Sequence, residues 1–444
     1  MYKKGAKKEL KNYRPISILS NVSKIFEGLI YSRIYSFFNS RDFLSNNQFG
    51  FRAGRNTEMA VLKLIERVMP AMSEGKFAIA VFLDFSAAFD TISRDLLMHK
   101  LNRYGVRGVP YGFLKSYFAD RRQFVCVGNA KSETMDQKTG IIQGSKMGPL
   151  FYDIYSNDIN RICDEGECLL YADDLCLTFV DRDYDRLLAL ANLRLSEISL
   201  WCLNNKLKVN PAKSEFLLIT HKLIPYEPTI HFNNDIILRK TNVRYLGIVI
   251  DHRLSFYDQL CSIRQKLSQL TGLVYRLNQY LTYDAAKKYY YSCVYSVFTY
   301  GLAAWGGILL CAASAPALER LQERLLRMLF RKYTNIDECI FKQTRTLKLR
   351  DIYRLHAGIY MFKIIRLNTC PTVTEGMPIR YPEHRYPTRR GSELVLPFPR
   401  VSSVRRGYQY QYIDIWNSLP GDIIQSTTLG QFKRKVSDHF MQLY

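Results

Sequence analysis

Zinc-binding patterns are missing from this sequence. Its ten cysteines include no CxxC pair and have no histidine pair at ligand spacing beside them. That absence excludes the common structural zinc sites. We interpret the cysteines as scattered, reduced thiols of a cytosolic or nuclear protein.

A secretory leader is missing as well. Residues 1–13 (MYKKGAKKELKNY) contain no apolar core of the kind that a signal peptide needs. We therefore expect a protein of the nucleus and cytoplasm that is not secreted.

Charge of either sign is absent from residues 289–318, which passes a crude filter for a membrane span. Three successive tyrosines, Tyr289 to Tyr291, and the broken stretch from Tyr300-Gly301 to Gly306-Gly307 argue against a span. We predict buried helices of a large domain here, and no membrane as a partner.

Acidic residues are in short supply. Asp and Glu number 40 against 63 Lys and Arg, which gives a net charge of +23. Such a surplus indicates a polyanionic partner, with nucleic acid favoured over an anionic membrane. Residues 151–200 reverse the balance, with 11 acidic residues against 4 basic ones. This pattern suggests a cation site inside an anion-binding cleft.

The chain is long and ordinary in its apolar content. Its 444 residues exceed what one hydrophobic core normally serves, so two or three subdomains are expected. With 47% hydrophobic and 23% charged residues, the composition is that of a globular protein.

Carboxylates end two strongly apolar segments. The run from Phe77 to Leu83 predicts a strand buried on both faces, with Asp84 at its end. Residues 168–179 read as two strands with Asp173 and Asp174 at the tip of a hairpin. Adjacent buried carboxylates repel one another, and a divalent cation would remove that penalty. Asp84 and Asp173 could hold two Mg²⁺ ions about 3.5–4 Å apart, with Mn²⁺ as a possible substitute.

Several segments resemble the motifs of reverse transcriptases. YADD (171–174) and FLDFSAAFD (82–90) resemble motifs C and A, and GIIQGSKMGPLFYDIYSNDI (140–159) is similar to motif B of non-LTR retrotransposon polymerases. The family's fingers motifs, motif D and motif E have counterparts, in family order, at residues 11–34, 46–57, 201–219 and 245–251. The sequence thus resembles jockey-like, LINE-type reverse transcriptases.

The resemblance implies an α+β right-hand polymerase. Fingers and palm would occupy residues 1–250, a helical thumb 251–345, and a basic C-terminal region 346–444. The endonuclease that usually precedes the fingers in this family is not represented in the chain.

The resemblance also implies a metal-binding triad of Asp84, Asp173 and Asp174. Lys213 matches the motif D lysine that protonates the pyrophosphate leaving group. Asp90 matches a position beside the site, where a structural or helix-capping role is the alternative to metal ligation.

The incoming nucleotide is expected to meet residues from three motifs. Phe89 matches the aromatic gate that excludes a 2′-hydroxyl, and its alternative is a plain core aromatic. Arg14 and Arg55 are weaker candidates, and for each of them a solvated surface position is equally open. The expected nucleotide-binding residues are Arg52, Phe89, Gln143, Gly144 and Arg14.

Nucleic acid is expected along the second half of the chain. The primer grip would be Tyr245, Leu246 and Gly247. Apolar spacing predicts helices at about residues 256–280 and 317–333. On the second helix an arginine stripe would follow the template–primer backbone, unless it is only a solvated basic face. The stripe consists of Arg320, Arg324, Arg327 and Arg331. The Arg- and Tyr-rich segment 376–410 suits RNA contact.

These observations predict an RNA-directed DNA polymerase. It would add dNTPs to the 3′-hydroxyl of a DNA primer on an RNA template, with two metal ions. One alternative is an inactive remnant that only binds nucleic acid, against which the intact aspartates argue. The other is an RNA-dependent RNA polymerase, against which the bulky Phe89 argues.

Overall fold

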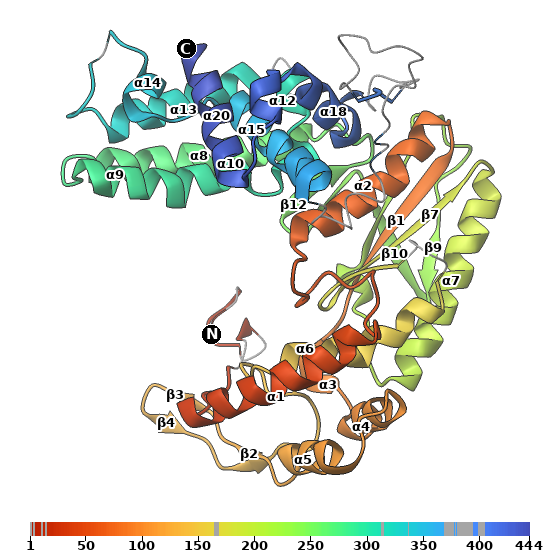
Figure 1. Cartoon of the computed structure of the whole chain (residues 1–444). Coiled ribbons are helices and arrows are strands. Elements are labelled where there is room, and N and C mark those ends of the chain that lie inside the picture. Colours follow the sequence, from red (N-terminus) through yellow and green to blue (C-terminus); the bar gives the residue numbers. More distant parts are fainter. Residues whose placement is uncertain are drawn as a thin grey trace.

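The computed structural model describes residues 16–163, 168–311, 315–335, 337–367 and 405–444, with the short pieces 2, 5–9, 12–13, 377, 379 and 394–397. In Figure 1 these residues form a C-shaped molecule. A sheet forms the back, one helical arm lies below it and a second helical arm lies above it. The predicted mixed α+β fold is confirmed.

A six-stranded sheet forms the palm, in the order β6-β7-β1-β8-β10-β9. All neighbours are antiparallel except β8 and β10, which are parallel. The strands are β1 (Phe77–Asp84), β6 (Cys168–Tyr171), β7 (Asp174–Asp181), β8 (Glu215–Ile219), β9 (Ile230–Phe232) and β10 (Asp235–Lys240).

Strand β1 is buried on both faces because alternate side chains enter two different cores. Ala78 and Ala80 belong to the cluster that contains helix α2 (Thr57–Ser73). Ile79 and Val81 belong to the cluster that contains helix α7 (Tyr184–Asn204). The period of two in a strand thus places a helix on each face. Asp84, the last residue, is the only one of the strand that is not fully buried.

The lower arm in Figure 1 belongs to the predicted fingers. It consists mainly of helices, and two short ladders, β2 with β5 and β3 with β4, project from it. Its elements are α1 (Asn21–Ser40), α3 (Ala88–Thr91), α4 (Arg94–Arg103), α5 (Gly108–Phe118), β2 (Arg122–Gln123), β3 (Cys126–Val127), β4 (Ala130–Lys131), β5 (Met135–Asp136), α6 (Gly148–Ser156) and the 3-10 helix η2 (Asn157–Arg161).

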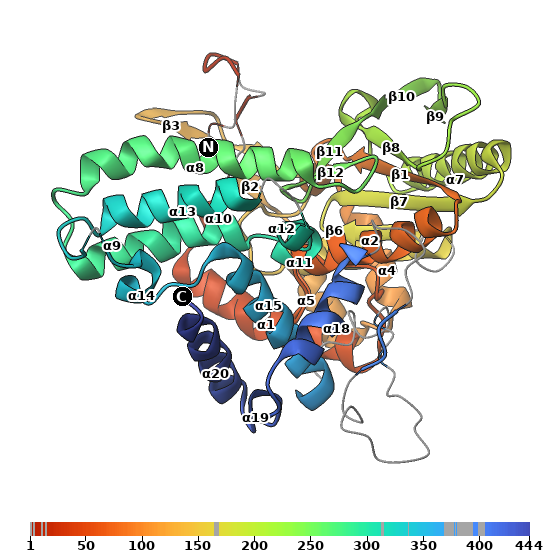
Figure 2. The ribbon, with the colours of Figure 1, turned by 90° about the horizontal axis from the view of Figure 1, so that it is seen from above.

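The two predicted thumb helices are confirmed as α8 (Tyr257–Leu277) and α13 (Ala315–Leu329). They lie side by side in Figure 2 and contact each other. The apolar stripe of α8 faces the core, because Leu260, Ile263 and Leu267 are buried there. A two-stranded hairpin, β11 (Asn242–Tyr245) with β12 (Ile248–Asp251), joins the palm to this arm.

The uncharged run at residues 289–318 is divided among short elements, as its glycines predicted. Tyr290, Phe298 and Trp305 from this run are buried in the thumb core. Among the described residues, none of the helices has the length and apolarity of a membrane span. The elements are α9 (Tyr283–Tyr289), the π-helix η4 (Tyr290–Tyr295), α10 (Ser296–Thr299), α11 (Leu302–Trp305) and α12 (Ile308–Cys311).

Helices of the C-terminal region share the thumb's core. One apolar cluster extends from α2 through the thumb to Phe440. Helix α15 contacts α18, α20 and the thumb helix α11. Most of the predicted RNA-contact segment 376–410 lies outside the described residues. The helices are α14 (Ile340–Thr344), α15 (Leu349–Phe362), α18 (Tyr408–Ser418), α19 (Gly421–Ile424) and α20 (Leu429–Gln442), with the π-helix η5 (Lys363–Leu367).

Candidate active site

Three aspartates meet at one end of the palm sheet. Asp84 is paired with Asp174 across β1 and β7. Tyr171 is the partner of Asp174 across β6 and β7, so Ala172 and Asp173 form a two-residue turn. The Cβ atoms of directly opposite residues in antiparallel strands lie about 4.5–5.5 Å apart. The register therefore brings Asp84 and Asp174 together, with Asp173 beside them.

The charges of these carboxylates are poorly compensated. Burial is the largest cause, and the charges of Asp173 and Asp84 follow; together they raise the pKa of Asp174 to about 6. A nearby cation is Lys213, whose Nζ lies 3.4 Å from Oδ2 of Asp84. Both side chains of this pair are accessible to solvent, so the pair itself is weak. The end of the sheet therefore has a strongly negative local field.

The loop that carries Lys213 is attached to the end of β1. Asn210 N donates to Asp84 O at 2.8 Å, and Asp84 N donates to Oγ of Ser214 at 3.3 Å. Ser86 N donates to Lys208 O at 2.7 Å. Lys213 itself ends the 3-10 helix η3 (Pro211–Lys213). These bonds explain why a lysine far along the chain lies beside the first aspartate, as the motif D resemblance predicted.

A fingers segment braces the turn between β6 and β7. Ala172 has a φ of 55°, which is unusual for a residue with a side chain. Its amide donates to Oε1 of buried Gln48 at 3.2 Å. A Cβ on Gly50 would lie 2.3 Å from Ala172 N, so only glycine fits there. The sequence alone does not indicate the importance of Gln48 and Gly50, because it depends on their contact with Ala172, more than 120 residues further along the chain.

The motif B loop joins the site through Asp90. Nε2 of Gln143 donates to both carboxylate oxygens of Asp90, at 2.7 and 2.8 Å. Gly144 has a φ of 105°, and Gln143 O accepts a bond from Ser17 N at 2.9 Å. Asp90 is therefore the partner of Gln143 in this structure. This contact is an example of the structural role that is the alternative to metal ligation by Asp90.

Phe89 is held in place by two rings. It stacks on Tyr152 with ring centroids 4.8 Å apart, and Phe51 meets its edge at 6.3 Å. Tyr152 is buried beneath it, and burial followed by the charge of Asp173 raises the pKa of the Tyr152 phenol far above its usual range. Phe89 thus lies on a fixed aromatic base close to the aspartates.

Arg52 lies near a buried acid rather than in open solvent. Its Nη1 donates to Ser45 O at 3.0 Å. Asp153 on α6 is 2% exposed, and neither of its oxygens has a hydrogen-bond partner among the described residues. Burial raises the pKa of Asp153 well above its usual range, and the positive charge of Arg52 opposes the rise. The structure thus brings Arg52 to the wall formed by motif B.

The other two arginines proposed for the nucleotide differ from Arg52. Arg55 donates to the backbone oxygens of Asn46 and Gln48, so it holds the loop that carries them. Arg14 lies outside the described residues.

The predicted primer grip is a tight turn. Leu246 and Gly247 have φ values of 47° and 84° between the paired residues Tyr245 and Ile248, as a type I′ hairpin requires. Tyr245 differs from Leu246 and Gly247 because it is buried, with its ring 5.1 Å from that of Phe82. Strand alternation directs its side chain into the core, so the exposed part of the grip is the turn alone.

Three of the four predicted thumb arginines lie on α13, and Arg331 lies beyond it because the helix ends at Leu329, short of the predicted residue 333. Arg320, Arg324 and Arg331 are exposed, and Arg327 forms an ion pair with Glu323 at 2.9 Å. Their contact with nucleic acid stays a prediction.

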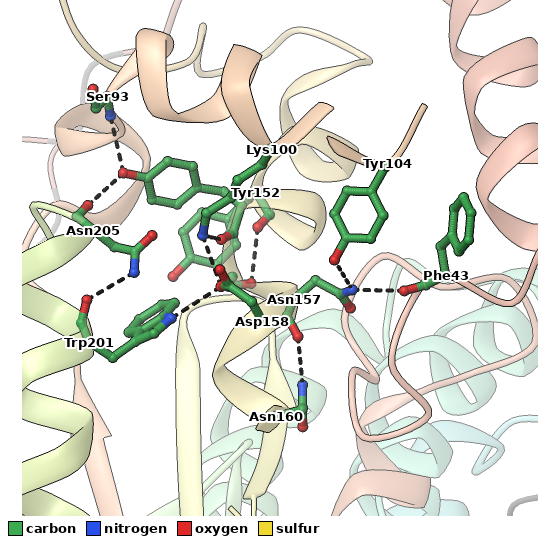
Figure 3. A network of polar contacts seen from close by, with 12 residues as sticks. Phe43, Ser93, Lys100, Tyr104, Tyr152, Asn157, Asp158, Asn160, Trp201 and Asn205 are labelled. Atoms are coloured by element: carbon green, nitrogen blue, oxygen red, sulfur yellow. Dashed lines mark hydrogen bonds and ion pairs between the residues drawn. The ribbon is translucent and has the colours of Figure 1, made fainter. Parts of the chain in front are cut away.

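A second polar network joins α6 and η2 to α4 and α7 (Figure 3). Nζ of Lys100 donates to Oδ1 of Asp158 at 2.8 Å and to Tyr155 O at 2.5 Å. Nε1 of Trp201 donates to the same Asp158 oxygen at 3.1 Å, and the hydroxyl of Tyr155 donates to Asn205 O at 2.5 Å. Burial lowers the pKa of Lys100, and Asp158 opposes that shift.

A preformed metal cluster is not part of this arrangement. In the described part of the chain, no three His, Cys, Asp or Glu side chains stand in a metal-holding group. What the sheet provides is the Asp84–Asp174 pair and Asp173 in the adjoining turn.

Known proteins with similar sequences identify the family of this chain. Residues 3–250 match the family described as "Reverse transcriptase (RNA-dependent DNA polymerase)". The chain is 33% identical over 328 residues to the probable RNA-directed DNA polymerase from transposon BS of Drosophila melanogaster, which covers 71% of this chain and 36% of that protein. It is 26% identical over 311 residues to the RNA-directed DNA polymerase from mobile element jockey of the same species, covering 67% of this chain and 33% of that protein.

A solved structure of telomerase from Candida albicans, in complex with a telomeric RNA fragment, is also similar. The identity is 14%, the match covers 74% of this chain and 58% of that one, and the TM-score is 0.38. The chain spans about a third of the length of the two curated polymerases. Because the family match covers more than half of its residues, the chain belongs to the reverse transcriptase (RNA-dependent DNA polymerase) family, and the resemblance to jockey-like polymerases is confirmed.

Proposed function

We propose that this chain catalyses RNA-directed DNA synthesis, adding a deoxynucleotide to a primer 3′-hydroxyl. The observation that carries the proposal is the strand register that pairs Asp84 with Asp174 and puts Asp173 in the adjoining turn. Nζ of Lys213 lies 3.4 Å from Oδ2 of Asp84. Membership of the family supports the proposal.

The residues fit divalent cations. Carboxylate oxygens are the ligands that Mg²⁺ and Mn²⁺ prefer. The raised pKa of Asp174 reports a site where negative charge lacks a partner, and a cation would supply one. Asp84, Asp173 and Asp174 would hold the metal, which would neutralise charge on the reacting phosphate. Reverse transcriptases generally use divalent metals, and Mg²⁺ is the ion that we propose for this chain.

The remaining side chains position the nucleotide. The Gln143–Asp90 pair and Gly144 form the wall that a base pair would approach, and Arg52 would bind the triphosphate as a bidentate donor. Lys213 would donate a proton to the departing pyrophosphate, a task for which its position beside Asp84 is suitable.

Phe89 would exclude ribonucleotides. Its ring rests on Tyr152 and therefore cannot retreat from a 2′-hydroxyl. Phe89→Val should raise the ratio of rNTP to dNTP incorporation at least 10-fold, as a lost steric contact of a few kcal/mol would. An unchanged ratio would show that Phe89 is a core aromatic and no gate.

The experiment that tests the function is primer extension on an RNA template with dNTPs and Mg²⁺. The wild type should extend the primer, whereas Asp173→Asn and a wild-type reaction with EDTA should not. If Asp173→Asn extends the primer as fast as the wild type, the proposed site is wrong. Template–primer binding without extension by the wild type would favour the inactive remnant.

A further inference from the structure

Tyr300 connects the thumb to the turn of the primer grip. It follows α10 in the uncharged run, and its side chain is 44% exposed. Its hydroxyl donates to Leu246 O at 2.7 Å. The bond joins residues 54 positions apart, so it fixes the turn against a different part of the chain.

A third segment meets the same hydroxyl. Oγ1 of Thr57, the first residue of α2, lies 3.4 Å from the Tyr300 oxygen. A phenol has one proton, which the shorter bond to Leu246 O uses, so the contact with Thr57 is the weaker of the two. The next residue, Glu58, accepts from Ala303 N at 2.8 Å. The start of α2, the thumb and the turn are thus tied at one point.

The backbone around Tyr300 fits this task. Gly301 has a φ of 61°, and a Cβ there would lie 2.2 Å from Cδ1 of Ile248. A Cβ on Gly247 would lie 3.0 Å from the Tyr300 ring. Nε1 of buried Trp305 donates to Tyr300 O at 2.9 Å. The ring and the turn therefore fit closely, with glycine on both sides of the contact.

The turn that Tyr300 holds also lies near the strand that carries Asp84. Tyr245, the residue before the turn, has its ring 5.1 Å from that of Phe82, which lies two residues before Asp84 on β1. The bond from Tyr300 thus sets the Leu246-Gly247 turn at a fixed place relative to the reacting end of the sheet.

We propose that Tyr300 is a positioning residue of the polymerase, which holds the Leu246-Gly247 turn so that the primer end is presented to the aspartates. This inference rests on the proposed function. Tyr300 acts through the turn, so its loss should affect the rate of chemistry and leave nucleotide binding unchanged.

The test compares Tyr300→Phe with Tyr333→Phe. Tyr333 is a matched control, because it is also 44% exposed and its hydroxyl donates to Leu281 O at 3.1 Å, within the thumb. Tyr300→Phe should lower kcat for primer extension about 3- to 10-fold, as expected for one hydrogen bond. The KM for dNTP and the Kd for template–primer should stay within about twofold of the wild type, since neither contact is removed. Tyr333→Phe should behave as the wild type.

Other results would overturn the proposal. These are an unchanged kcat in Tyr300→Phe, an equal loss in both variants, or a change confined to the KM for dNTP. A wild type without activity would refute the proposed function instead, and hydrogen exchange separates the two failures. In the protein without substrate, amides of residues 245–249 should exchange faster in Tyr300→Phe than in Tyr333→Phe. Equal exchange would refute the anchoring itself.

Discussion

Aspartate and lysine side chains meet both at the reacting end of the palm sheet and in the polar network that joins α6 and η2 to α4 and α7. The negative charge is poorly balanced at the first place and well balanced at the second. At the end of the sheet, Lys213 lies 3.4 Å from Asp84, while Asp173 and Asp174 add further negative charge and the pKa of Asp174 is raised to about 6. In the polar network, the single carboxylate of Asp158 accepts a hydrogen bond from Nζ of Lys100 at 2.8 Å and another from Nε1 of Trp201 at 3.1 Å.

The two places differ in how well nearby donors balance the negative charge of the aspartates, rather than in how deeply the aspartates are buried. Asp158 receives two donors, and Lys100 is mostly buried with a carboxylate and a carbonyl as partners. The end of the sheet has an excess of like charge and a left-handed Ala172 in its turn. Unsatisfied charge and backbone strain together are typical of a functional site, whereas satisfied charge is typical of a scaffold.

The largest effect is expected from Asp84→Asn. Extension activity should fall about 10³-fold or more, because the substitution removes charge that acts on the transferred phosphate. The melting temperature should not fall, since repulsion is relieved. Asp95→Asn, an exposed position on α4, is the control and should keep full activity. A large loss of folded protein in Asp84→Asn would show that Asp84 stabilises the fold, contrary to the functional role predicted for this end of the sheet.

Lys213→Met should follow, with kcat lowered by about 10²-fold because a proton donor is lost. Stability should change little, since the ion pair with Asp84 is exposed. Lys208→Met changes an exposed lysine on the same segment and serves as the control in a single-turnover assay. Equal losses in both variants would indicate general electrostatics instead of proton transfer.

Lys100→Met tests the satisfied cluster. It leaves Asp158 and the Tyr155 carbonyl without their shared donor, so the free energy of unfolding should fall by about 1–3 kcal/mol. Urea denaturation measures this loss, and Lys115→Met on the exposed face of α5 provides the control. Activity per folded molecule should stay within about twofold. A stable but inactive Lys100→Met variant would refute the assignment as scaffold.

The smallest effect is expected from Asp174→Asn in metal-free protein. The folded pKa of about 6 lies above the roughly 3.9 of an unfolded aspartate, so the folded state binds this proton more tightly. The carboxylate therefore destabilises the fold above pH 6, and that penalty disappears as the pH falls from 6 to 4. Asp174→Asn should raise Tm by about 1–2 °C at pH 7 and leave it unchanged near pH 4. If the Tm of Asp174→Asn at pH 7 were lower than that of the wild type, the Asp174 carboxylate would be stabilising the fold, contrary to the prediction.

Much of this fold follows from local patterns in the sequence. The apolar run before Asp84 predicts β1, and the run on each side of Asp173 predicts the β6–β7 hairpin. Spacing of leucines predicts α8 and α13 to within a few residues at each end. These features depend on periodicity, which is visible in a single segment.

What the sequence did not predict depends on side chains that meet across long separations. The Gln143–Asp90 bond, the Gln48–Ala172 brace and the Tyr300–Leu246 bond each join distant segments. Tyr245 is different, because strand alternation alone would have placed it in the core. Its position in a motif suggested an exposed role that the alternation of β11 opposes.

The most direct test is a thermal melt of metal-free protein with added Mg²⁺ or Mn²⁺. A bound ion stabilises the folded state, so wild-type Tm should rise by about 2–4 °C when the ion is well above its dissociation constant. Asp158→Asn should show the same rise from a lower starting Tm, and Asp174→Asn should show almost none. Equal rises in Asp174→Asn and the wild type would contradict the cation site at the end of the palm sheet.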